Sequence, residues 1–196
     1  DSALFNNGTG ATEAAHGIAN TAVGSKALFT NTTGYFNTAN GSNALFSNTT
    51  GFQNTASGTG SLRSNNTGIL NTSTGFNSLF GNTSGNENSA FGNAALANNT
   101  GGLSNSAFGS GSLVNNSTGN TNTGMGYVSL FNNQTGFSNV AVGTHALFNN
   151  GNRSNLVAIG DSALFNNGIG ATLAAHGIAN TAIGSKALFN NTTGYF

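Results

Sequence analysis

Hydrophobic and polar positions recur along this chain with a fixed 17-residue period that runs without a gap from Asn20 to Asn155. Counted from the asparagine that opens the unit, position 9 is always leucine, and position 3 is always Ala, Ser or Gly. Positions 12 to 15 are rich in Asn, Thr and Gly. Bulky, small and turn-forming residues at constant spacing are typical of a solenoid, in which each repeat packs on its neighbours.

Each unit predicts two short strands and a corner. In the unit that begins at Asn20, these strands are residues 21–24 and 26–30, and Asn-Thr-Thr-Gly at 31–34 is typical of a turn. A helix is disfavoured, because glycine recurs at two positions and costs about 1 kcal/mol at each inside a helix. The chain has no proline, so every residue can donate its N–H to a neighbouring rung. We therefore predict an all-β fold, a parallel β-solenoid (β-roll) with one 17-residue repeat per rung.

A longer period is superimposed on the first. Residues 161–196 repeat residues 1–36 with four differences, so the superrepeat is 160 residues long: eight units of 17 and one 24-residue unit at 156–179. We expect residues 1–196 to be one continuous solenoid segment, a window of a longer array. The long unit should project a loop once per superrepeat. At about 4.8 Å per rung, that interval is roughly 43 Å.

The leucine column is the predicted core, with the small residue at position 3 facing it across a thin interior. Its members are Leu28, Leu45, Leu62, Leu79, Leu96, Leu113, Leu130, Leu147, Leu164 and Leu188.

Position 10 is mostly phenylalanine, and the alternation of a strand should turn it and position 8 away from the leucine. An outward apolar stripe of this length exceeds what soluble monomers usually expose, so it predicts self-association into a homo-oligomer or filament. A bent strand that admits both Leu and Phe to one core would instead leave a monomer. The candidate interface residues are Phe29, Phe46, Phe80, Phe131, Phe148, Phe165 and Phe189.

Asparagine at positions 1 and 12 has two interpretations. Stacked amides can form a hydrogen-bonded ladder, which is a structural role. Position 12 also opens N-x-S/T sequons, which are acceptors for N-glycosylation. The candidate glycosylation residues are Asn31, Asn48, Asn82 and Asn191.

Composition narrows the function classes. The four acidic and four basic residues balance, so a nucleic-acid partner is not expected, and without cysteine there is no thiolate metal site. So few carboxylates do not furnish the acid pair of a glycosidase, and we expect neither enzymatic activity nor a cofactor. His16 and His176 occupy one position of the long-unit loop, and the set of several ligands that a metal site needs does not recur around them. No apolar run approaches the length of a membrane span.

Three segments resemble a known repeat: N-T-A-I-G-S-K-A-L at Asn180–Leu188, N-S-A-F-G-N-A-A-L at Asn88–Leu96, and N-L-V-A-I-G-D-S-A-L at Asn155–Leu164. They are similar to the head repeat of YadA-like trimeric autotransporter adhesins and to Asn/Thr/Gly-rich repeats of bacterial surface and phage tail-fibre proteins. The resemblance implies a left-handed parallel β-roll, three chains side by side, and projection from a cell to bind host matrix or other surfaces. The 17-residue unit is longer than the usual head repeat of that family.

These observations favour a structural, adhesive extracellular fibre: a rigid shaft within a giant repetitive protein at the cell surface. The alternative is a ligand-binding adhesin head or phage tail fibre that recognises matrix protein or glycan. Threonine is frequent at position 2, as in ice-binding solenoids, but Ser89, Ser106, Val140 and Val157 interrupt that column. Ice binding is therefore the weakest of the three hypotheses.

Overall fold

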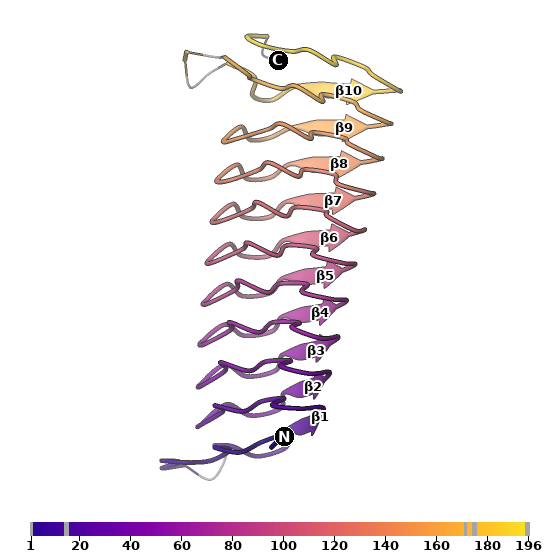
Figure 1. Cartoon of the computed structure of the whole chain (residues 1–196). Coiled ribbons are helices and arrows are strands. Elements are labelled where there is room, and N and C mark those ends of the chain that lie inside the picture. Colours follow the sequence, from indigo (N-terminus) through magenta and orange to yellow (C-terminus); the bar gives the residue numbers. More distant parts are fainter. Residues whose placement is uncertain (1, 14–15, 171, 174–175, 195–196) are drawn as a thin grey trace.

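The structure, a computed structural model, describes residues 2–13, 16–170, 172–173 and 176–194. Within them, ten three-residue strands stack in sequence order as one parallel sheet (Figure 1). The strands are β1 (Thr21–Val23), β2 (Thr38–Asn40), β3 (Thr55–Ser57), β4 (Thr72–Thr74), β5 (Ser89–Phe91), β6 (Ser106–Phe108), β7 (Thr123–Met125), β8 (Val140–Val142), β9 (Val157–Ile159) and β10 (Thr181–Ile183).

Neighbouring strands pair at the spacing of the sequence repeat. Thr21 of β1 lies opposite Thr38 of β2, an offset of 17 residues, whereas Val157 of β9 lies opposite Thr181 of β10, an offset of 24. One repeat therefore forms one rung. The predicted all-β parallel solenoid is confirmed.

The second predicted strand is wrong. Residues 26–30 form consecutive turns, because the backbone is left-handed at position 7 and again at position 9, with φ of 56° at Lys26 and 48° at Leu28. A strand needs negative φ at each residue. Left-handed leucine is costly, and the neighbouring rungs compensate: Leu28 donates its N–H to the Ala44 carbonyl at 3.0 Å, and Asn43 donates to the Ser25 carbonyl at 2.8 Å.

The left-handed backbone at positions 7 and 9 changes which side chains face the interior. Ala27 and Leu28 are adjacent, yet both are fully buried, so position 8 does not turn away from the leucine as the sequence analysis expected. The small residue at position 3, such as Ala39, is buried from the sheet side. The core is thus one leucine and two small residues per rung, repeated along the axis.

The leucine column lies within this core along most of its length. From Leu28 to Leu164 its members have no exposed surface, while Leu188, on the last described rung, is 49% exposed. The buried residues of the column are Leu28, Leu45, Leu62, Leu79, Leu96, Leu113, Leu130, Leu147 and Leu164.

The corner at positions 12 to 15 is bonded to the next corner. Thr32, Thr33 and Gly34 all donate backbone N–H groups to the Thr49 carbonyl, at 3.0, 3.0 and 3.1 Å. The corners at 32–34, 49–51 and 117–119 each aim three donors at a single acceptor one rung away, and the corners at 66–67, 83–84 and 100–101 aim two.

The long unit connects β9 to β10 and leaves the stack as a projecting loop (Figure 1). Gly168 still donates to the Asn191 carbonyl at 2.7 Å, and Gly177 rejoins the stack by donating to the Gly194 carbonyl at 3.1 Å. The described residues between these two bonds are 169–170, 172–173 and 176. The strand register between β9 and β10 is undisturbed.

Glycine at position 5 is required by both conformation and space. At Gly92, φ is 140°, and a Cβ would lie 2.6 Å from the carbonyl carbon and oxygen of Gly109. We predict that Gly92→Ala lowers the free energy of unfolding by at least roughly 2 kcal/mol, since the strained backbone alone costs about 1–3 kcal/mol. Urea denaturation followed by circular dichroism measures the change.

Gly101→Ala is the matched control. Its Cβ would contact one side-chain atom, Ser84 Oγ, at 3.6 Å. Stability should be unchanged or raised by up to about 1 kcal/mol, because alanine restricts the unfolded chain. Equal losses in the two variants would contradict the predicted close approach of rungs at position 5.

Candidate functional site

The asparagines at position 12 form a ladder of side-chain hydrogen bonds along the axis. Asn48 Nδ2 donates to Asn31 Oδ1 at 2.7 Å and to the Gly51 carbonyl of its own corner at 2.9 Å. Asn48 Oδ1 in turn accepts from Asn65 Nδ2 at 2.8 Å. Both amide hydrogens and the oxygen are therefore used, which is what a fully buried amide requires.

A second ladder runs through position 1 and converges on the same corner. Asn54 donates from its backbone N and its Nδ2 to Asn37 Oδ1, at 3.0 and 3.1 Å. Asn37 Nδ2 donates to the Gly51 carbonyl at 2.9 Å, the oxygen that also accepts from Asn48. The two ladders and the glycine carbonyl thus form one buried network that ties each corner to the start of its own strand.

Leu156 interrupts the second ladder at the long unit. It occupies position 1 and is fully buried, but its side chain offers no amide. Its backbone N still donates to Asn139 Oδ1 at 3.1 Å. The axial backbone contact therefore continues through the break in the amide ladder.

The candidate glycosylation residues are part of the first ladder. Asn31, Asn48 and Asn82 have no exposed surface. Asn191, on the last described rung, is partly exposed, and its Nδ2 donates to Asn167 Oδ1 at 2.9 Å. N-glycosylation attaches the sugar to Nδ2. At the three buried positions, this nitrogen would be accessible to the modifying enzyme only before the chain folds.

The candidate interface phenylalanines stack on one another. Phe148 and Phe165 have ring centroids 5.0 Å apart and planes 5° from parallel, and Phe165 and Phe189 repeat this geometry. Each inner ring is covered on its faces by the rungs above and below. The rings are half-buried and turn their edges, rather than their faces, to the surroundings.

Arg63 replaces a phenylalanine in this column and preserves the stack. Its guanidinium carbon lies 5.5 Å from the ring centroids of both Phe46 and Phe80. A guanidinium over an aromatic face is favourable by about 0.5–1 kcal/mol at an exposed site. We call the column from Phe5 to Phe189 the phenylalanine ladder; Ala97 and Val114 interrupt it.

The outward face of the sheet carries positions 2 and 4. Thr21, Thr38 and Thr55 are exposed at position 2, and the column changes to partly exposed Val140 and Val157 in β8 and β9. Position 4 does not stand out as a column in the sequence, because its residue type varies from unit to unit. Its order along the chain, polar in β2 to β4 and apolar from β5 onward, is the signal that could have identified it.

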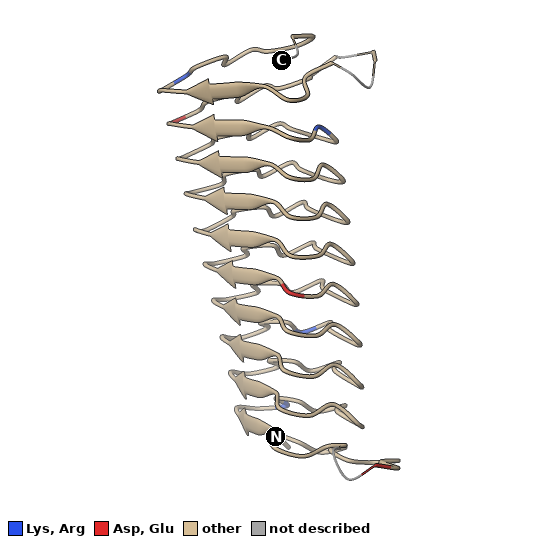
Figure 2. Cartoon of the chain, turned by 180° about the vertical axis from the view of Figure 1, so that it is seen from behind, with Lys and Arg blue, Asp and Glu red and all other residues tan. Residues whose placement is uncertain are grey.

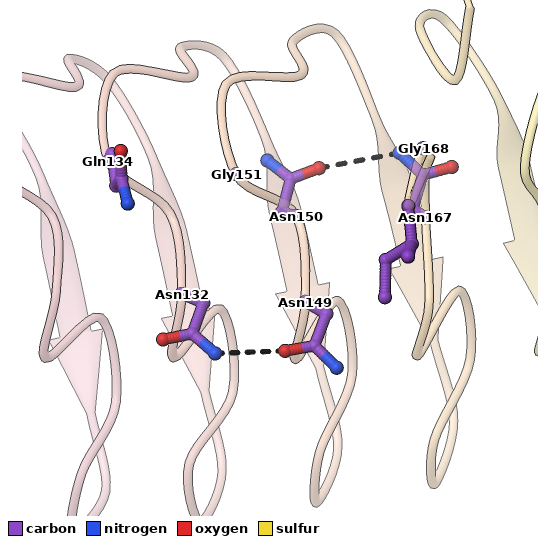
Figure 3. A pocket seen from close by; sticks show the side chains of 8 residues that line it. Asn132, Gln134, Asn149, Asn150, Gly151, Asn167 and Gly168 are labelled. Carbon is purple, nitrogen blue, oxygen red and sulfur yellow. Dashed lines mark hydrogen bonds between the residues drawn. The ribbon is translucent and has the colours of Figure 1, made fainter. Parts of the chain in front are cut away.

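A hollow of about 320 Å³ opens beside the long unit (Figure 3). It exists because Gly151 and Gly168 occupy position 13, where the preceding rung carries Gln134. Asn132 and Asn149 lie along one side and are joined by a hydrogen bond of 2.9 Å. Its full lining is Asn132, Gln134, Asn149, Asn150, Gly151, Asn167, Gly168 and Ile169.

Charged residues are scattered along the stack and lie outside the strands (Figure 2). His16 Nε2 lies 3.6 Å from Glu13 Oε2, while Nδ1 of His16 and of His176 is shielded and makes no hydrogen bond among the described residues. The described part of the chain contains no group of three or more His, Cys, Asp or Glu residues placed to hold a metal ion. Nor do those residues include a helix of the length and hydropathy needed to cross a membrane.

No protein-family model, curated protein or solved structure gives a significant match to this chain.

The asparagine ladder can be tested by a change that keeps its shape. Asn82→Asp replaces the Nδ2 donor by an oxygen that would face two acceptors, Asn65 Oδ1 and the Gly85 carbonyl. We predict a loss of roughly 3 kcal/mol or more in the free energy of unfolding at pH 7, since one oxygen of the buried carboxylate would keep the Asn99 Nδ2 donor while the other would face only acceptors. Chemical denaturation at several pH values measures the loss.

The pH dependence has a definite sign. Burial among acceptors should raise the folded-state pKa of the new carboxyl above its unfolded value of about 3.9, so stability falls as pH rises through that value. Asn98→Asp, at exposed position 11, is the control and should cost less than about 1 kcal/mol. A similar loss in both variants would contradict the structural role of the buried ladder.

Proposed function

We propose that this chain is a segment of a structural, adhesive fibre outside the cell, in which the solenoid is a rigid shaft. The observation that carries the proposal is the repetition of one set of axial bonds. Backbone N–H groups, asparagine amides and aromatic rings of each rung all contact the next rung, as shown by Leu28 to Ala44, Asn48 to Asn31, and Phe29 to Phe46. Stiffness along the axis is the property that such repetition supplies.

The extracellular, cell-surface setting rests on the resemblance to YadA-like head repeats and to bacterial surface and tail-fibre repeats. A neutral, proline-free chain of interchangeable rungs suits a shaft that spans distance. Self-association would let several shafts share a load. The stacking within the phenylalanine ladder supports a role in stiffening each shaft, because the faces of its inner rings already have partners.

The shaft proposal predicts that length grows in proportion to the number of superrepeats. Tandem chains with one, two and three copies of residues 1–160, each followed by residues 161–196, should lengthen by roughly 43 Å per copy. Electron microscopy and small-angle X-ray scattering measure the longest dimension. A dimension that rises with the cube root of chain mass would indicate a compact particle and contradict the proposal.

A second candidate function, glycan binding, is favoured by the hollow beside the long unit. Five of its eight lining residues carry side-chain amides and none is charged, and amides both donate to and accept from sugar hydroxyls. Gln134 is exposed, and its side chain lies apart from the hydrogen-bonded amides of Asn132 and Asn149 (Figure 3). The ligand that fits this chemistry is a neutral saccharide.

The glycan hypothesis is tested by screening neutral oligosaccharides on an array and titrating any that bind. Gln134→Ala should weaken binding up to about tenfold, the effect of one lost hydrogen bond of about 0.5–1.5 kcal/mol. Gln53→Ala, an exposed glutamine on another rung, is the control and should leave the affinity unchanged. Absence of binding above background, or equal effects of the two variants, would reject this hypothesis.

A further inference from the structure

Position 4 changes character along the outward face of the sheet: it is apolar at Val23 in β1, polar in the next three strands and apolar again from β5. In β2, β3 and β4 it is occupied by Asn40, Ser57 and Thr74. From β5 to β10 it is apolar without exception, although the remainder of each rung keeps the same pattern. We name these six residues the sheet patch: Phe91, Phe108, Met125, Val142, Ile159 and Ile183.

The sheet patch is more exposed than the inner rings of the phenylalanine ladder, although Phe91 and Phe108 also stack on each other with ring centroids 5.0 Å apart. Phe91 and Phe108 are 36% and 39% exposed, Met125 is 46% exposed, and Ile183 is 69% exposed. The outward strand side chains beside them are hydroxyl or valine side chains. A continuous apolar column on an otherwise polar surface marks a contact site.

The electrostatics of this face suit an identical partner. None of the ten strands contains a charged residue, so two copies of the face meet without the repulsion that like charges would impose. The face is also a regular lattice with one row of side chains per rung. A second copy of the same sheet has rows at the same spacing and can therefore match it along its whole length.

The order of side-chain sizes selects an orientation. The first three members of the patch are Phe, Phe and Met, and the last three are Val, Ile and Ile. A two-fold axis that passes between β7 and β8 reverses the partner and brings each member of the first group opposite one of the second. Phe91 then faces Ile183, Phe108 faces Ile159, and Met125 faces Val142.

We propose that the sheet patch is the contact surface between two copies of this chain, packed face to face and antiparallel. This contact goes beyond the shaft function proposed above, since it concerns how shafts meet at their sides. Such an interface is isologous, because each residue pair occurs twice across the axis. Two sheets packed in this way lie about 10 Å apart, with their side chains between them.

The area of the sheet patch limits the affinity between two chains. Six rungs at about 4.8 Å, each about 10 Å wide over three residues, give roughly 300 Å² of projected area on each copy. Stable complexes bury about 800 Å² per partner, so the contact between two single chains is weak and reversible. Repetition of the patch along a longer array would strengthen it by avidity.

Sedimentation velocity over a range from about 10 µM to 1 mM tests the proposal on the chain as it stands. A reversible monomer–dimer equilibrium is expected. The triple variant Phe91→Thr, Phe108→Thr, Ile159→Thr should raise the dissociation constant at least tenfold. Threonine occupies position 4 in β4 and favours strands, so the fold should persist, which circular dichroism verifies.

The control variant is Phe76→Thr, Tyr127→Thr, Phe137→Thr. It removes three exposed aromatic rings that lie outside the strands. It should dimerise like the parent chain. A parent that stays monomeric throughout, or a control variant that dissociates as much as the patch variant, would overturn the proposal. Dissociation by changes in the phenylalanine ladder alone would likewise assign the contact to that surface.

Orientation is tested separately with a spin label on Ser89→Cys, because the chain contains no other cysteine. Ser89 lies in β5, which faces β10 of the antiparallel partner, so the two labels should be separated by five rungs, roughly 24 Å along the axis. A parallel, in-register pair would bring them within about 10 Å. That short distance would refute the antiparallel arrangement, whereas the rod-length measurement would be unaffected.

Discussion

The register of 17 residues between successive rungs is the constraint on which the rest of this structure depends. The core of each rung is thin, one leucine and two small residues, so a single rung buries little apolar surface by itself. Bonds to the neighbouring rung supply what the core does not. Because Asn48 must reach both Asn31 and Gly51, an insertion of one residue within the unit would separate backbone donors from acceptors and leave buried amides unpaired.

The long unit shows how an insertion can be accommodated. Its extra residues lie between Gly168 and Gly177, outside the bonded parts of the rung, and the pairing of β9 with β10 keeps all three residues in step. Three irregular features lie close to one another here: the projecting loop, the amide-lined hollow and the break in the asparagine ladder at Leu156. The change in unit length thus falls where it leaves the pairing of the strands intact.

Much of the fold could be predicted from the sequence because the strongest structural constraints act at every rung. Leu45 and Ala39 are buried in two columns, one always leucine and the other always a small residue. Such columns can be recognised in a single sequence. The left-handed leucine at position 9 was not predictable, since leucine disfavours that conformation and only bonds to other rungs stabilise it. The sheet patch, which includes Met125, was not predictable for another reason. An outward position tolerates many side chains, so the patch is visible only in the order of residue types from strand to strand.

Both buried asparagine ladders point the same way. At most steps, Nδ2 of the later rung donates to Oδ1 of the earlier one, as in Asn65 to Asn48 and Asn71 to Asn54. At the steps from Asn37 to Asn20 and from Asn139 to Asn122, the backbone N of the later rung makes this bond instead. Aligned amides polarise one another, so the two buried ladders add to a dipole along the shaft. The exposed ladder at position 11 opposes it, because there Asn98 Nδ2 donates to Asn115 Oδ1 of the later rung. Within the buried layer, the two ends of a stack are chemically unlike: one offers unpaired amide oxygens and the other unpaired N–H groups. Stacks of this kind can be joined end to end only head to tail, which gives the shaft a direction that its uniform outline conceals.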